Sequence, residues 1–151
     1  MKILVISGSR NRQGRTALAI KAIIKGVEDG GAAAETVFLP EFKIERCRQC
    51  NADGWGKCLE EGKCVIQDDF PELVDRIKAA DLIVFANPVY YHDLAESMKT
   101  FLDRYRRITA PWLQVHGGGR PGTTPDIPGQ PAMGLCYAGG SGNGTTACAE
   151  V

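Results

Sequence analysis

The chain has 151 residues, and its 18 basic and 18 acidic side chains give a formal net charge of zero. This balance gives no support for nucleic acid or an anionic membrane as a partner, and no apolar run reaches the roughly 20 residues of a membrane-spanning helix. The length suits one domain, residues 1–151, with a core of its own. No small-residue cleavage site follows the first apolar run, so we expect a cytoplasmic protein without a secretory signal.

The first forty residues predict a strand, a loop, a helix and a second strand. Residues 2–6 form a continuous, largely β-branched run, which is typical of a strand that is buried on both faces. From 16 to 29, apolar side chains recur at helical spacing, and Gly30 and Gly31 favour a left-handed end to this helix. Residues 35–39 then predict the second strand.

Two further helices are predicted by pairs of acidic side chains that precede apolar stripes. Asp69 and Glu72 stand three residues apart, which is the spacing of a capping box, ahead of a helical face over 70–77. Asp93 and Glu96 repeat this spacing ahead of the next stripe. We therefore expect Asp69 and Asp93 to cap the two helices.

The remaining strands are predicted at 82–86 and 131–137, which are short and apolar. Alternating strands and helices predict a doubly wound α/β sheet with right-handed crossovers, in the flavodoxin-like order 2-1-3-4(-5). A fifth strand usually completes this order, and without it the fourth would be an apolar edge. We therefore expect that the sequence lacks its last strand.

The loop over residues 7–16, between the first strand and the first helix, has glycines, hydroxyl side chains and three arginines. N–H groups at a helix start lack partners and carry partial positive charge, so they bind phosphate readily. Five residues separate Gly8 from Gly14, and Arg15 follows, so the spacing matches neither a Walker A motif nor G-x-G-x-x-G. The loop predicts another kind of anion site, and a simple turn with solvated arginines is the alternative.

Two more loops, 87–92 and 138–144, follow the third and fourth predicted strands. Because the carboxyl ends of parallel strands meet at one edge of the sheet, we expect these loops to join 7–16 around a single ligand-binding crevice. Residues 106–130 are rich in Gly and Pro, which indicates a lid, an arm at a subunit interface or a mobile loop. Asp103 and Arg104 are expected to form a helix ion pair or part of that interface.

Four of the six cysteines fall within the segment 44–66, separated by two, seven and five residues. Without a signal peptide, such a cluster favours metal binding or redox chemistry over structural disulfides. Four thiolates can bind a [4Fe–4S] cluster or a tetrahedral zinc ion. Reduced thiols without metal, or an adventitious disulfide, are the third possibility. The cysteines are Cys47, Cys50, Cys58 and Cys64.

Three stretches together resemble the NADPH-dependent FMN reductase family, a flavodoxin-like group that includes the iron–sulfur flavoproteins. They are Gly-Ser…Gly-Arg-Thr in 8–16, the end of the cysteine segment in 62–69, and Asn-Pro-Val-Tyr…Lys-x-Phe-x-Asp-Arg in 87–104. The resemblance covers nearly the whole chain and implies a three-layer α/β/α fold that binds FMN. Arg10 departs from it, because the family usually has proline there, and the cluster-binding members have a tighter run of cysteines.

The resemblance also implies roles for individual residues, in three groups. One group would hold the FMN phosphate, a second would line the ribityl chain and the flavin ring, and a third would face the polar edge of the ring with backbone N–H groups. Packing at a helix entry is the alternative role for the two tyrosines of the second group. The groups are Ser9, Arg10, Asn11, Gly14, Arg15 and Thr16; Pro88, Val89, Tyr90 and Tyr91; and Gly139, Gly140, Ser141 and Gly142.

On this resemblance, we expect an FMN-dependent NAD(P)H oxidoreductase that assembles as a homodimer or homotetramer. Hydride would be exchanged at flavin N5 without a catalytic side chain. The electrons would pass to a quinone, azo or nitro compound, to free flavin or to an iron–sulfur acceptor. The alternatives are an electron-transfer iron–sulfur flavoprotein without NAD(P)H turnover of its own, and a zinc-stabilised binding module.

Overall fold

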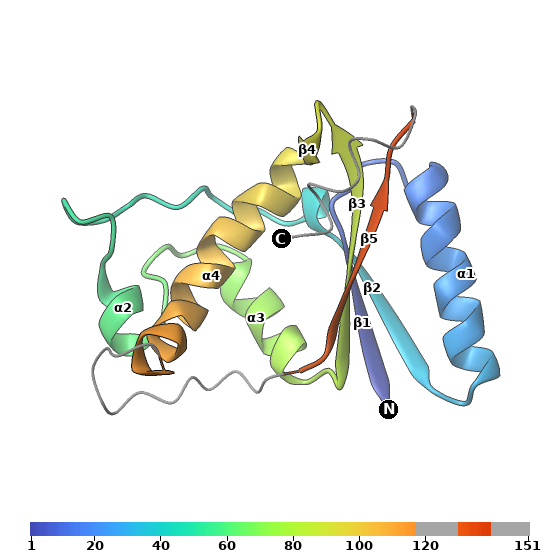
Figure 1. Cartoon of the computed structure of the whole chain (residues 1–151), viewed down its shortest axis with the longest axis horizontal. Helices are drawn as coiled ribbons and strands as arrows, with labels where there is room; N and C mark the ends of the chain where they lie inside the picture. The colour runs from blue at the N-terminus through green and yellow to red at the C-terminus, as the bar shows by residue number, and fades with distance from the viewer. Residues whose placement is uncertain (117–129, 140–151) are drawn as a thin grey trace.

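A computed structural model describes the backbone of residues 1–116 and 130–139, and the side chains of these ranges except 109–116. In this part of the chain, four parallel strands form the centre of the domain (Figure 1). The strand β1 lies between β2 and β3, and β3 pairs on with β5. The order β2-β1-β3-β5 confirms the predicted flavodoxin-like order, with β5 as the fourth predicted strand. These strands are Lys2–Ser7, Ala33–Phe38, Leu82–Tyr90 and Ala132–Tyr137.

Helices cover both faces of the sheet, which confirms the predicted three layers. The helix α1, Arg15–Asp29, lies on one face, and α3, Phe70–Lys78, lies with α4, Glu96–His116, on the other (Figure 1). Side chains alternate along β1, so that Ile3 and Val5 pack towards α1 while Leu4 and Ile6 join the core under α3 and α4. A β1 that is buried on both faces explains its continuous apolar sequence.

The start of α3 differs from the predicted capping box. Asp69 makes no side-chain capping bond within the described residues; instead, its Oδ2 accepts the N–H of Lys43 at 2.7 Å. The N–H of Phe70, in the first turn, is bound by Oδ1 of Asp68 at 3.2 Å. The helix is where the sequence places it, but the capping role of Asp69 was wrong because a distant backbone donor occupies its carboxylate.

The second predicted capping box is also wrong. The strand β3 continues to Tyr90, and a two-residue turn reverses the chain into β4, Asp93–Leu94, which pairs with it antiparallel. Tyr91 and His92 both have positive φ, 51° and 62°, as in the type I′ turns that match the twist of a hairpin. Asp93 therefore lies in a strand, and α4 begins only at Glu96.

The helix α4 continues to His116 and so takes up the first part of the segment 106–130, while 117–129 lie outside the described residues. Inside the cysteine segment, the short helix α2, Lys57–Glu61, lies beside α4. None of the helices in the described ranges is both long enough and apolar enough to cross a membrane. The cysteine segment therefore packs against the C-terminal part of α4.

Candidate functional site

The loop after β1 is fixed to the end of β3 and to the start of α4. The N–H of Gly8 donates to the carbonyl oxygen of Ala86 at 2.9 Å, and Ser97 Oγ donates to the carbonyl oxygen of Gly8 at 3.0 Å. A Cβ atom at Gly8 would lie 2.5 Å from Oδ1 of Asn87, so any larger residue would displace Asn87 or the loop. Two of the three predicted loops therefore meet at one edge of the sheet, as expected.

Short-range hydrogen bonds give the loop its shape. Ser9 Oγ accepts the N–H of Asn11 at 3.2 Å, and Asn11 Oδ1 accepts the N–H of Gln13 at 2.9 Å. The Asn11 carbonyl then accepts the N–H of Gly14 at 3.2 Å. Such side-chain turns fix the path of a loop without regular structure. They lead the chain into α1 with the side chains of Ser9 and Thr16 buried.

The N-terminus of α1 has the properties of an anion site. Gly14, at the N-cap, makes no side-chain capping bond in the described part of the chain, and the first turn has no acidic residue. Its first N–H groups have no acceptor inside the helix. Arg15 is exposed and makes no ion pair with any described side chain, and Arg10 meets only Glu96, at 3.8 Å. Uncapped N–H groups beside an available guanidinium fit the phosphate of FMN.

Arg12, the third arginine of this loop, lies away from the helix start. Its guanidinium binds both carboxylate oxygens of Glu41 at 2.5 Å and stacks 4.7 Å above the ring of Phe38. Hydrogen bonding to Glu41 raises the pKa of Arg12 and lowers that of Glu41. Arg12 therefore ties the loop to the segment after β2.

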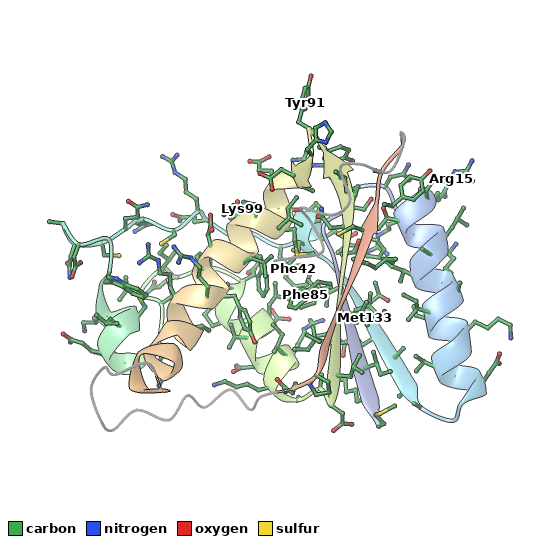
Figure 2. All side chains as sticks on the ribbon, viewed as in Figure 1. Arg15, Phe42, Phe85, Tyr91, Lys99 and Met133 are labelled. Carbon is green, nitrogen blue, oxygen red and sulfur yellow. The ribbon has the colours of Figure 1, made fainter. Side chains whose placement is uncertain are left out.

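The residues predicted to face the flavin lie at the end of β3 and in the following turn. Pro88 is buried and Val89 half-buried, whereas Tyr90 is 60% and Tyr91 102% exposed. Figure 2 shows Tyr91 at the tip of the hairpin, at the same end of the sheet as Arg15. Exposed aromatic faces near an anion site fit a planar ring with a phosphate tail.

The third predicted loop begins at the same edge. Tyr137, the last residue of β5, is in register with Pro88 of β3, and Gly139 follows two residues later. The other residues of this group, Gly140, Ser141 and Gly142, lie outside the described residues. The position of Gly139 agrees with a loop that reaches the crevice.

The four cysteines of the segment 44–66 line one small cavity, with a volume of ≈ 20 Å³. Burial raises the pKa of the Cys58 thiol, and the neighbouring Cys64 and Cys47 raise it further. As placed, no set of three or more His, Cys, Asp or Glu side chains in the described ranges could hold a metal ion. The donor set fits a thiolate-bound metal centre by its chemistry, but ligation would require the thiols to move together.

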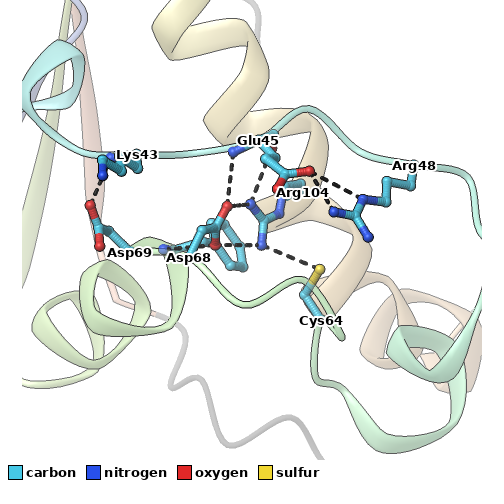
Figure 3. Close-up of polar contacts among 8 residues, drawn as sticks. Lys43, Glu45, Arg48, Cys64, Asp68, Asp69 and Arg104 are labelled. Atoms are coloured by element: carbon cyan, nitrogen blue, oxygen red, sulfur yellow. Dashed lines mark hydrogen bonds and ion pairs between the residues drawn. The ribbon is translucent and has the colours of Figure 1, made fainter.

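Arg104 of α4 connects this cavity to the core (Figure 3). Its guanidinium makes a bidentate ion pair with Asp68, lies 4.2 Å above the ring of Phe70, and donates from Nη2 to Sγ of Cys64 at 3.3 Å. Burial works to raise the pKa of Asp68, but the hydrogen bonds from Arg104 and from backbone N–H groups outweigh it and lower that pKa. This network locks the end of the cysteine segment onto α4.

The expected pairing of Asp103 with Arg104 is therefore wrong: Asp103 accepts from Lys99, and Arg104 pairs with Asp68. A sequence signal for this exists. Arg104 stands at helical spacing from Phe101 and Ile108, which are both buried, so it lies on the core-facing stripe of α4.

A larger basic pocket adjoins the cysteine cavity and shares three residues of its wall. It encloses ≈ 560 Å³ and brings together arginines from the cysteine segment and from α4. Arg107 is held there by stacking 4.3 Å above the ring of Trp55, and Arg48 by hydrogen bonds to Glu45. The sequence did not predict this pocket, because its two halves are far apart along the chain. Its lining residues are Arg46, Cys47, Arg48, Gln49, Asp103, Arg106 and Arg107.

Several known proteins are similar to this chain in sequence or in fold. Iron–sulfur flavoproteins of Archaeoglobus fulgidus and Methanocaldococcus jannaschii are 36% and 34% identical over 104 and 108 residues, which are 69% and 72% of this chain. The matches cover 45% and 53% of those proteins, so the chain spans about half their length. An NAD(P)H:quinone oxidoreductase from Methanothermobacter marburgensis has the same fold, with a TM-score of 0.72 at 22% identity over 97% of this chain and 71% of that one.

A flavone reductase also shares the fold, with a TM-score of 0.64 and 24% identity, over 93% of this chain and 44% of that protein. The family model for NADPH-dependent FMN reductases matches residues 1–150. That range includes the loop at 7–16, the hairpin of β3 and β4, and the cysteine segment. The chain therefore belongs to the NADPH-dependent FMN reductase family.

Proposed function

We propose that this protein is an FMN-dependent NAD(P)H oxidoreductase. The observation that carries the proposal is the meeting of an uncapped helix N-terminus with exposed aromatic side chains at one edge of the sheet. The backbone bond from Gly8 to Ala86 fixes these two features relative to each other. A dianionic phosphate needs donors and a flavin ring needs a flat apolar wall, and this edge supplies both.

In this proposal, the loop before α1 holds the phosphate and the end of β3 holds the ring. The first-turn N–H groups, Arg15 and the hydroxyls of Ser9 and Thr16 donate to the phosphate, with Arg10, Asn11 and Gly14 shaping the loop. Residues 88–91 line one side of the ribityl chain and ring, and backbone N–H groups of 139–142 face its polar edge. Bound FMN supplies hydride exchange with a nicotinamide and electron transfer to an acceptor.

The proposed co-substrate is a nicotinamide nucleotide. The proposed acceptors are a quinone, azo or nitro compound, free flavin or an iron–sulfur partner. We further propose a cytoplasmic homodimer or homotetramer. Tyr90 and Tyr91 are exposed at this edge. Their exposure supports either a subunit interface here or packing of these rings against the bound flavin, because both would remove large aromatic side chains from water.

Removing the two hydroxyls tests the phosphate site. We expect Ser9→Ala and Thr16→Ala each to weaken FMN binding about tenfold or more, because each removes a donor to a charged group. Thr36→Ala is the matched control, since its buried Oγ1 has no hydrogen-bond partner among the described residues. Fluorescence titration of FMN measures the affinity, and steady-state NADPH and NADH oxidation measures turnover. Unchanged affinity in the Ser9→Ala, Thr16→Ala double variant would contradict the assignment of this loop.

A second candidate function is electron transfer by an iron–sulfur flavoprotein. It is favoured by the four cysteines that line one cavity and by Arg104, which lines the same cavity and whose buried Nε has no hydrogen-bond partner in the described part of the chain. A bound group with acceptor sulfurs would satisfy this donor. In this candidate, Cys47, Cys50, Cys58 and Cys64 hold a [4Fe–4S] cluster that relays single electrons.

Anaerobic purification with a visible spectrum and analysis of iron, sulfide and zinc separates the candidates. Broad iron–sulfur absorption with bound iron supports the second candidate, and a flavin spectrum without iron excludes it. Zinc bound to a colourless protein that takes up no FMN would instead support a zinc-stabilised binding module.

A further inference from the structure

The basic pocket, where the cysteine segment meets α4, is a feature that neither candidate function uses. It encloses ≈ 560 Å³, and four arginines line it, from the cysteine segment and from α4. Among the described residues, Asp103 is its only acidic lining residue, and Lys99 already binds that carboxylate. The chain as a whole has a net charge of zero, so this pocket is a local excess of positive charge.

Two of these arginines have no carboxylate partner in the described part of the chain. Arg48 donates to Glu45 at 3.1 and 2.7 Å, whereas Arg46 and Arg107 make no ion pair with a described side chain. Arg46 is exposed and Arg107 is half-buried. Removing a charged group from water is unfavourable unless an opposite charge or hydrogen-bond acceptors replace the water. An anion bound in the pocket would supply both to Arg107.

Arg107 is also held in one place by a neighbouring turn. Its guanidinium stacks 4.3 Å above the ring of Trp55, and a Cβ atom on Gly54 would lie 3.6 Å from its Nη2. Backbone bonds close this turn, from Asn51 to Trp55 at 2.7 Å and from Gly54 to Asn51 at 2.8 Å. A stacked ring covers the flat face of a guanidinium and leaves its in-plane N–H donors available. The turn therefore positions Arg107 as a donor.

The basic pocket is separate from the loop at 7–16. Ser97 Oγ, near the start of α4, contacts that loop at Gly8. Arg106 and Arg107 follow nine and ten residues later, about 14 Å farther along the helix axis. Figure 1 shows the cysteine segment and α1 on opposite sides of the sheet. One phosphate group cannot contact both places, so the FMN phosphate in the proposed site does not account for the pocket.

The size and the chemistry of the pocket select a class of ligand. Its volume lies in the range of about 300–1,000 Å³ that is usual for small-molecule sites. The planar fork of arginine matches phosphate oxygens in pairs, and a cleft lined by one sign of charge concentrates ligands of the opposite sign. We propose that the basic pocket is a second anion site that binds a phosphate group of a small molecule, with Arg46 and Arg107 as its main donors.

This phosphate group has two possible sources with the same chemistry. One is the 2′-phosphate that distinguishes NADPH from NADH, a group that arginine binds in other nucleotide sites; this source rests on the proposed function. The other is a separate phosphate-bearing molecule, which does not depend on that function. A binding experiment tests the site itself, and a kinetic experiment distinguishes the two sources.

The binding experiment is calorimetric titration of the full chain with inorganic pyrophosphate in phosphate-free buffer. We expect the wild type to bind, and Arg46→Gln and Arg107→Gln each to weaken binding about tenfold or more, because each removes charged hydrogen-bond donors. Arg76→Gln is the matched control: it removes the same charge, and Arg76 also lies above an aromatic ring, 5.6 Å from that of Phe42, but outside the pocket. Its affinity should equal that of the wild type.

Three further variants keep this experiment decisive. The Ser9→Ala, Thr16→Ala double variant weakens any binding of pyrophosphate at the loop and should retain binding in the pocket. Arg107→Lys keeps the charge but loses the planar fork, so we expect an affinity between those of the wild type and Arg107→Gln. If Arg107→Gln does not fold, Arg46→Gln decides, because Arg46 is exposed.

The kinetic experiment measures KM and kcat for NADPH and for NADH. A several-fold rise in KM for NADPH alone in Arg46→Gln, with KM for NADH unchanged, assigns the pocket to the 2′-phosphate. Unchanged values for both nucleotides, together with weakened pyrophosphate binding, assign it to a separate phosphate-bearing molecule. A wild type that binds no pyrophosphate, or Arg46 and Arg107 variants that bind it as tightly as the wild type, would overturn the inference. A protein that binds pyrophosphate in the pocket but oxidises neither nucleotide would overturn the proposed function alone.

Discussion

The loop at 7–16, which we propose binds the FMN phosphate, and the cysteine segment at 44–66 are built in different ways. The loop lies between a buried strand and a long helix, and the backbone bond from Gly8 to Ala86 of β3, together with short-range side-chain bonds, fixes its position. The cysteine segment contains only the short helix α2 and is held by side chains, chiefly by the network around Arg104. The N–H groups at the start of α1 are thus placed by regular structure, whereas the positions of the four thiols depend on individual side-chain contacts.

The largest expected effect comes from breaking the Arg104–Asp68 pair. Asp68→Asn removes one partner of a buried ion pair, and we expect a loss of about 3 kcal/mol or more in the free energy of unfolding, measured in urea. The FMN affinity of the folded protein should stay the same, because the proposed phosphate-binding loop at 7–16 is held by other contacts. Glu45→Gln, which breaks the exposed pair with Arg48, is the control and should change stability by about 0.5 kcal/mol or less.

The same pair predicts a dependence of stability on pH. The pKa of Asp68 is lowered in the folded protein, so the folded state binds fewer protons there than the unfolded chain does. Its contribution is complete above the ordinary aspartate pKa of about 4 and is lost as the pH falls through the lower folded value. The difference in unfolding free energy between wild type and Asp68→Asn should therefore shrink in acid. A difference that grows on acidification would contradict the role of the ionised carboxylate.

An intermediate effect is expected from a methyl group at Gly8, whose N–H joins the loop at 7–16 to β3. Its Cβ would lie 2.5 Å from Asn87 Oδ1 and 3.0 Å from Met98 Cβ. Gly8→Ala should cost about 1–3 kcal/mol of stability and weaken FMN binding by displacing the loop. Gly134→Ala in β5 meets no atom within 4 Å and is the control. Thermal unfolding and FMN titration of both variants give the comparison, and equal FMN affinities would argue against a rigid link.

The sequence predicts the strands and helices that position the loop at 7–16 well. The strand order followed from the alternation of strands and helices along the chain. The apolar runs located the strands, because a strand that is buried on both faces must be apolar throughout, as β1 is. The capping predictions for Asp69 and Asp93 were wrong. The Asp69 carboxylate accepts the backbone N–H of Lys43, and Asp93 lies in a hairpin. Both results depend on contacts or turn geometry that local spacing does not contain.

For the cysteine segment, the sequence predicted only which four thiols come together. Spacing along the chain identified the four thiols, and the structure places them around one cavity. The role of Arg104 depends on Asp68, which is distant in sequence, and on Cys64, whose side chain it meets only once α4 has packed against the cysteine segment. A charged residue on the apolar stripe of a helix is the signal that could have indicated it.

The smallest stability effects are expected at two exposed residues with the same backbone strain, one in the hairpin beside the loop at 7–16 and one in the cysteine segment. Tyr91 in the hairpin and Gln49 in the cysteine segment both have positive φ, 51° and 48°, and both are exposed. Glycine adopts this conformation without the steric cost that other residues have, but it also loses more backbone entropy on folding. Tyr91→Gly and Gln49→Gly should therefore each change the unfolding free energy of the FMN-free protein by about 1 kcal/mol or less. Only Tyr91→Gly should weaken FMN binding, because only Tyr91 lies at the proposed flavin edge, so equal FMN affinities in the two variants would contradict a role for Tyr91 in covering the ring.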